Sequence, residues 1–232
     1  MIGNNVYGGG NNLLPYITSK ANTVVNVESG NSITNTINVK TGDVILALVM
    51  YRDINSLTIT GNGWTKIIES PEVEYSDTTL HHKCAFYKKT ATTTATESVT
   101  FTQSSANRMQ LILVAFNNVS DIQYDSYYNI NHTGTNEDYL TKPFYQIPKK
   151  TTNDYIIYGA TSILWSTTQP DDFWQIKNNS LYIIQNQYTN IQSRLCLIDN
   201  IIGNEQYEIK ATPNTYDISF VLIGVKLIPK QK

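Results

Sequence analysis

The sequence has few charged residues, and this shortage excludes two classes of partner. Charged residues make up 16% of the 232 residues and the formal net charge is -2, so the chain has no general attraction for nucleic acid or acidic membranes. The longest apolar runs, 44–51 and 218–228, are too short or too interrupted to span a bilayer. We therefore expect neither nucleic-acid binding nor membrane insertion.

Cysteines and targeting signals are also scarce. The only two cysteines, Cys84 and Cys196, fall inside expected strands, where buried free thiols are more common than a disulfide. Residues 1–12 have neither a basic start nor an apolar stretch, so we expect no secretory signal peptide.

Strong helix formers are in short supply, whereas residues that favour strands are abundant. Asn, Thr, Ser and Tyr stand where Lys and Glu usually stand, and Tyr alone occurs 16 times. No segment of a dozen residues keeps apolar positions at helical spacing with capping residues. The sequence therefore predicts an all-β protein.

The first half contains a series of short strand patterns separated by Gly, Asn and Thr turns. Alternating runs predict half-buried strands, and the continuous apolar runs at 44–51 and 109–116 predict strands buried on both faces. The expected strands are 22–27, 33–39, 44–51, 57–60, 64–70, 82–90, 98–102 and 109–116.

The second half repeats this order about 111 residues later. The strand pattern of residues 153–162 corresponds to that of residues 42–51, and the pattern of 192–200 corresponds to that of 82–90. A tryptophan follows a polar turn in each half, Trp64 in "GWTKI" and Trp174 in "FWQIK", where we expect it to pack in the core or as a lid.

A shared order of elements predicts a repeated unit. We expect two jelly-roll-like or Greek-key antiparallel β-sandwich repeats, 21–120 and 121–232, either in tandem or fused into one larger sandwich. Residues 1–20 read as a flexible or particle-docking arm.

No catalytic constellation stands out. The sequence has no nucleophile elbow, zinc-protease, P-loop or Rossmann motif. If the chain is extended there, His81 and His82 point to opposite faces and cannot readily share a metal ion. We expect these two residues and His132 to be solvated histidines. Loop carboxylates are usually turn formers, although a glycosidase pair or a structural calcium site remains an alternative; they are Glu72, Glu74, Asp77, Asp171 and Asp172. We expect no enzyme, cofactor or metal.

Exposed aromatic residues are the better candidates for binding. Trp165 lies just past an expected strand, in a polar loop, where a ring can stack on a sugar or pack against a neighbouring subunit. Tyr124, Tyr127, Tyr128 and Tyr139 form a second group near the junction of the halves. Packing between domains and lining of strand faces are the alternative interpretations.

The first half also resembles a known family. Its order of "GDVILALVMY" (42–51), "GWTKI" (63–67), "CAFYKK" (84–89) and "SVTFTQSSANRMQLILVAFNNVSDI" (98–122) resembles a β-sandwich of phage and prophage virion proteins. The resemblance covers roughly residues 20–228. The second half departs from the pattern, with Asn153 in place of Gly and Phe173 before the Trp.

Such modules occur in tail, baseplate and fibre proteins, and some related jelly rolls bind glycans. The resemblance therefore implies a non-enzymatic virion protein, assembled in the bacterial cytoplasm. Other virion proteins and further copies of the chain would be its partners, and a host-surface glycan its candidate ligand. A lectin-like carbohydrate-binding module and a purely structural decoration or collar protein are the alternatives.

Overall fold

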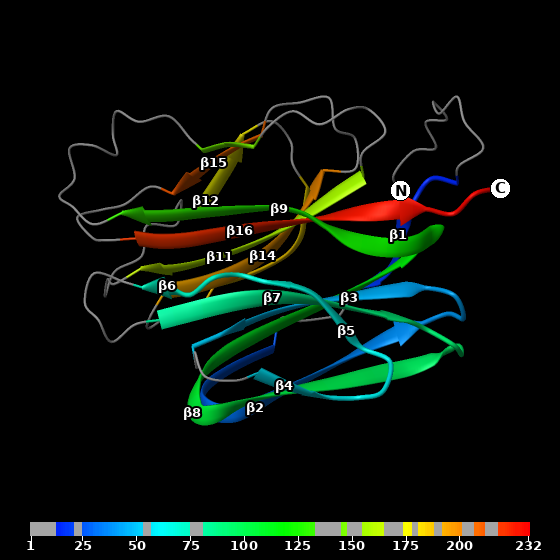
Figure 1. Cartoon of the computed structure of the whole chain (residues 1–232), viewed down its shortest axis with the longest axis horizontal. Coiled ribbons are helices and arrows are strands. Elements are labelled where there is room, and N and C mark those ends of the chain that lie inside the picture. The colour runs from blue at the N-terminus through cyan, green and yellow to red at the C-terminus, as the bar shows by residue number, and fades with distance from the viewer. Residues whose placement is uncertain are drawn as a thin grey trace.

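The protein, in a computed structural model, is built from antiparallel β-strands. The structure describes residues 13–20, 25–52, 57–74, 81–132, 145–147, 155–164, 174–177, 181–187, 192–200, 207–211 and 218–232. These residues form strands and no helix (Figure 1), so the expected all-β class is confirmed for them.

The strands fall into an eight-stranded, a three-stranded and a five-stranded sheet. In chain order they are β1 (Tyr16–Lys20), β2 (Val25–Val39), β3 (Val44–Tyr51), β4 (Leu57–Thr60), β5 (Thr65–Glu69), β6 (Val73–Glu74), β7 (His81–Thr90), β8 (Ala95–Asn117), β9 (Val119–His132), β10 (Tyr145–Ile147), β11 (Tyr155–Leu164), β12 (Trp174–Lys177), β13 (Leu181–Gln187), β14 (Gln192–Asn200), β15 (Tyr207–Ala211) and β16 (Ile218–Pro229).

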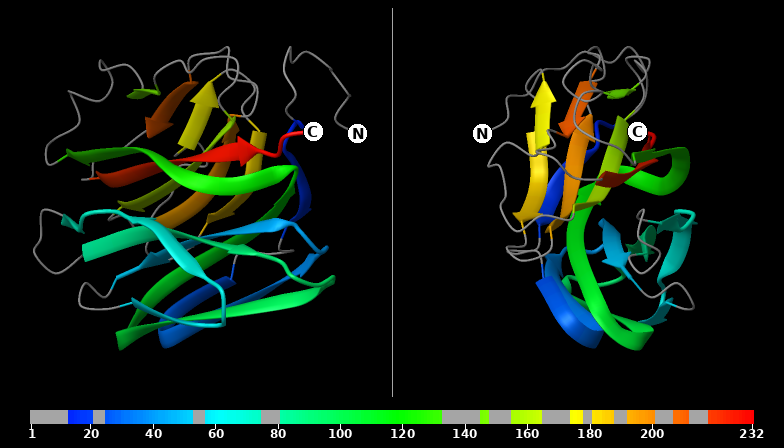
Figure 2. Two further views of the ribbon diagram at one scale, coloured as in Figure 1. Left: turned by 45° about the vertical axis from the view of Figure 1, so that its right-hand side comes forward. Right: turned by 90° about the vertical axis from the view of Figure 1, so that its left-hand side faces the viewer.

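Strand β8 organises the first half because it pairs along both of its edges. β1 and β2 follow one another along one edge, and β3 and β4 occupy the other. The pairing with β2 shifts register on both sides of Gly30, opposite the middle of β8. There the buried Gln103 donates from Nε2 to the carbonyl oxygens of Gly30 (3.2 Å) and Asn107 (2.8 Å). These bonds hold the point where the 23-residue β8 passes from one layer to the next (Figure 2).

The central layer has the strand order β1-β8-β3-β7-β5, and its middle strands, β3 and the second half of β8, are buried on both faces. All eight residues of β3 are buried, as the continuous apolar run 44–51 predicts. Ile45, Ala47 and Val49 pack in one hydrophobic cluster with the outer layer of β2, the first half of β8, and β4. Leu46, Leu48 and Met50 pack in another with the sheet β13-β14-β11-β16-β9. Figure 1 shows this central layer between the other two.

The second of these clusters joins the two halves of the chain. It combines residues of β3, β7 and β8 with Ile157 of β11 and with four residues of β16: Val221, Ile223, Val225 and Leu227. The Lys88 ammonium of β7 also pairs with the Asp121 carboxylate and donates to the Ile122 carbonyl oxygen of β9 (2.9 Å). In the described residues, the halves therefore share one core.

The two largest sheets have related pairings. The strand order β8-β3-β7 in one corresponds to β16-β11-β14 in the other. Val44 lies opposite Phe116 across β3 and β8, and Tyr155 lies opposite Leu227 across β11 and β16. Each member of the second pair follows its counterpart by 111 residues.

The short strands that begin near the tryptophans do not correspond in this way. β12, which starts at Trp174, pairs with β15, whereas β5, which follows Trp64, pairs with β7. The expected match of 173–177 with 63–67 is therefore not seen in the pairing. A polar turn followed by Trp occurs in both places, but the local sequence does not determine which strand the following residues pair with. The ring of Trp64 packs against the outer cluster, as expected, and the ring of Trp174 lies outside the described side chains.

Part of the expected arm belongs to the fold. β1 pairs with the end of β8, and Thr18 donates to the buried carboxylate of Asp43 (2.9 Å). The Leu13 N–H donates to the carbonyl oxygen of Lys230 (2.8 Å). These contacts hold residues 13–20, the second part of the predicted arm 1–20, against the strands of the fold. Residues 1–12 lie outside the described part.

Gly159 of β11 lies in tight contact with side chains of the facing sheet. A Cβ built there would come within 2.6 Å of Phe86 Cζ and 2.7 Å of Leu48 Cδ2. Leu48 and Phe86 are fully buried, so neither can move into solvent. The position requires glycine for its lack of a side chain.

We expect Gly159→Ala to destabilise the protein by about 1–3 kcal/mol through overpacking. Denaturant unfolding of the variant and the wild type would measure this. Leu48→Val is the matched second change, because it removes the nearest Leu48 methyl positions. In a double-mutant cycle the two substitutions should be less destabilising together than the sum of each alone. Additive effects would mean that Gly159 does not face Leu48.

Candidate functional site

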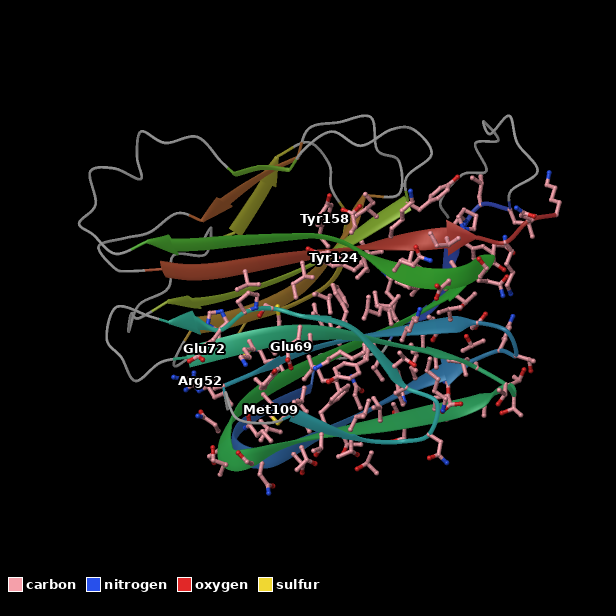
Figure 3. All side chains as sticks on the ribbon, viewed as in Figure 1. Arg52, Glu69, Glu72, Met109, Tyr124 and Tyr158 are labelled. Carbon is pink, nitrogen blue, oxygen red and sulfur yellow. The ribbon has the colours of Figure 1, made fainter. Side chains whose placement is uncertain are left out.

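Only one of the expected binding residues has a described side chain. Tyr124 lies on β9, an outer strand of the five-stranded sheet, and its ring is 49% exposed (Figure 3). Tyr127 and Tyr128 lie on the same strand, opposite Ile223 and Leu222, but their side chains lie outside the description. Trp165 and Tyr139 fall wholly outside the described residues. The structure therefore locates one exposed ring and does not test the proposed aromatic group.

The residues before Tyr124 are fixed by polar contacts. Asp121 binds Lys88 and accepts from Gln123 Nε2 (3.3 Å) and the Ile122 N–H (2.8 Å). Burial alone would raise the pKa of Asp121, but these hydrogen bonds and the Lys88 charge outweigh it and lower that pKa. The strand is thus held in place while the Tyr124 ring remains available. An exposed phenol ring can stack on a sugar or pack against a protein.

One of the three histidines, His82, differs from the expectation, and the side chains of the other two lie outside the description. His82 is buried, with 1% of its surface exposed, although the sequence predicted a solvated residue. It alternates along β7 with Cys84 and Phe86, which both belong to the cluster between the large sheets. Its place in this alternation accounts for its burial. Among the described residues, no group of three or more His, Cys, Asp or Glu side chains could hold a metal ion.

A buried phenol and a carboxylate connect β3 with β5. The Tyr51 hydroxyl donates to Glu69 Oε1, and Lys66 Nζ lies 3.3 Å from Glu69 Oε2. Burial, followed by the contact with Glu69, raises the pKa of Tyr51, and burial raises the pKa of Tyr87 to about 12. Burial works against ionisation of Glu69, but its bonds to Tyr51 and Lys66 outweigh this and lower its pKa. Both phenols are therefore neutral and Glu69 is charged at physiological pH.

Two arginines become neighbours only through strand pairing. Arg52 follows the end of β3, and Arg108 precedes Met109, the residue that pairs with Tyr51. Burial and then the Arg108 charge lower the pKa of Arg52 to about 10, so Arg52 remains charged at neutral pH. Figure 3 shows Arg52 at one end of the central layer. Sequence reasoning missed this pair of arginines because the two residues are far apart in the chain.

The outer layer presents an uncharged polar surface that we call the hydroxyl face. It consists of Ser32, Thr34, Thr36 and Asn38 of β2, Thr58 and Thr60 of β4, and Thr96, Ser98, Thr100 and Thr102 of β8. Thr34 and Thr100 share a hydroxyl hydrogen bond (2.7 Å), and Thr96 donates to Asn38 Oδ1 (2.7 Å). The signal for this face lies in the polar positions of "ITNTINV" and "SVTFT", which alternate with the apolar positions that predict the core.

Comparisons with models of protein families, with curated proteins and with solved structures find no match for this chain. Among the described residues, no helix has the length and apolarity needed to cross a membrane.

Proposed function

We propose that this chain is a non-enzymatic structural protein of a bacteriophage or phage-like particle, displayed on the particle surface in association with a tail or fibre. It assembles in the bacterial cytoplasm with other virion proteins and further copies of itself. The observation that carries the proposal is that the residues of the virion-protein pattern are turns and core positions of the fold. A structural module needs a pattern of this kind, since it requires residues that fix its fold and not residues that catalyse a reaction.

The "GD" of the pattern illustrates this. Gly42 has a φ of 85°, in the left-handed region that favours glycine. Asp43 is fully buried and its carboxylate accepts from Thr18 Oγ1 (2.9 Å), the Lys40 N–H (3.0 Å) and Asn117 Nδ2 (2.9 Å). A buried carboxylate needs such partners. The motif therefore fixes the turn before β3 and the ends of β1 and β8.

The proposal includes two jelly-roll-like repeats fused through one core. In its support, Ile45 lies opposite Lys89, and Ile156 lies opposite Asn200, again 111 residues later for each member. The same displacement relates the β3–β8 pair to the β11–β16 pair. A common register across three consecutive strands favours duplication over independent strand pairing.

Purified particles from cells that carry the gene would test this role. An antibody raised against the full-length chain should label the particle surface in electron microscopy, and mass spectrometry should find the chain in the particle band. A cytosolic enzyme of the same cells, absent from that band, serves as the control. Recovery of the chain only in the soluble fraction of the lysate would refute the virion role.

A lectin-like module is the second candidate, and the exposed ring of Tyr124 favours it. On this reading the full-length chain binds a host-surface glycan, and Tyr124→Ala or Trp165→Ala lowers the affinity about tenfold, the effect of roughly 1.4 kcal/mol. A glycan screen followed by titration would measure this. Tyr16→Ala is the matched control, because the Tyr16 ring on β1 is 51% exposed. If the folded wild type binds no glycan, the purely structural decoration or collar role is favoured.

A further inference from the structure

Strand β2 lies at an edge of the outer layer. Its only strand partner among the described residues is β8. Figure 2 shows β2 as an outermost strand of that layer. Edge strands usually carry charged side chains or proline, which prevent another strand from pairing with them. Residues 31–39, "NSITNTINV", contain neither.

This stretch is nearly symmetric about Asn35. Thr34 and Thr36 flank it, and Ile33 and Ile37 stand one step further out. A two-fold axis at Asn35 would lay β2 antiparallel to itself in a second copy, with Thr34 opposite Thr36 and Ile33 opposite Ile37. Thr–Thr pairs across antiparallel strands are favourable, and a two-fold interface requires such self-complementarity.

The burial of these side chains agrees with this pairing. Ile33 and Ile37 are buried in the cluster beneath the outer layer, whereas Thr34 and Thr36 are exposed. Two paired copies would therefore continue both the apolar inner side and the hydroxyl face of the layer from one molecule to the other. The alternation is matched because opposite residues in antiparallel strands share a face.

The backbone hydrogen bonding of β2 and the charges at its two ends also favour antiparallel pairing with a second copy. The Thr36 N–H donates to the side-chain oxygen of its neighbour Asn35 (2.8 Å), a local acceptor that a carbonyl oxygen of a second strand could replace. The nearest charged residues along the strand are Glu28 and Lys40, at opposite ends of the stretch. An antiparallel copy brings unlike charges to the same end.

We propose that two copies of this chain associate by antiparallel pairing of β2 with β2 about a two-fold axis at Asn35. The inference identifies a self-association surface, and it rests on the proposed function only for the expectation of a homo-oligomer. The second copy is the occupant that the symmetric sequence selects, since an unrelated strand would need no such symmetry.

Disulfide trapping in the full-length chain tests the register of this pairing. Thr34→Cys mixed with Thr36→Cys should give a covalent dimer of twice the 26.2 kDa chain mass under mild oxidation. Each variant alone should give little, because identical positions lie diagonally across the axis, about 7–8 Å apart and beyond the reach of a disulfide. Thr34→Cys mixed with Thr60→Cys, an exposed position on β4, is the matched control. Equal trapping in all mixtures, or trapping by one variant alone, would overturn the proposal.

Sedimentation equilibrium of uncross-linked protein gives an independent measurement. Thr36→Lys should weaken dimerisation at least tenfold, since it places a charge at the edge, while Thr60→Lys should not change it. A monomeric wild type that is still found on particles would sink this interface and leave the virion role intact. A β2-linked dimer that is absent from particles would support this interface and refute the virion role.

Discussion

Burial of the middle strands of the central layer on both faces is the constraint on which the rest of the structure depends. A strand such as β3, with no exposed residue, is stable only if apolar surface covers each side of it. Strand β8 supplies one cover by passing into the outer layer, where it pairs with β2 and β4. The sheet of β9, β16 and β11 supplies the other. The first half alone would therefore leave an apolar face uncovered.

Positions related by the 111-residue displacement belong to the hydrophobic cluster between the two large sheets. Leu46 and Ile157 belong to the same cluster, as do Ile112 with Ile223 and Val114 with Val225. If the halves are the proposed repeats, equivalent faces pack against each other as in a two-fold dimer. At its centre a large residue meets the smallest one, Leu48 against Gly159, which lets the two sheets approach closely. The proposed β2 pairing would place a true two-fold axis on the opposite side of the first half.

Sequence patterns predicted what depends on local alternation and missed what depends on long-range pairing. The apolar run 44–51 identified the strand buried on both faces, and Trp64 was correctly assigned to packing. The burial of His82 was missed although it alternates with Cys84 and Phe86 along β7, because a histidine at such a position is expected to be solvated. Arg52 and Arg108 meet only because β3 pairs with β8. Of the candidate binding residues, Tyr124 has an exposed ring, while the position of Trp165 stays a prediction.

The central claim is that both halves are stabilised by one shared core. Native-state hydrogen exchange tests it most directly, because it gives an opening free energy for each strand. The account predicts that the slowest amides of β3, Val44–Tyr51, and of β11, Tyr155–Leu164, exchange only through global unfolding and with the same free energy. Exchange of the β11 amides through an opening several kcal/mol below that of β3 would contradict it, since the second sheet would then separate while the first half stayed folded.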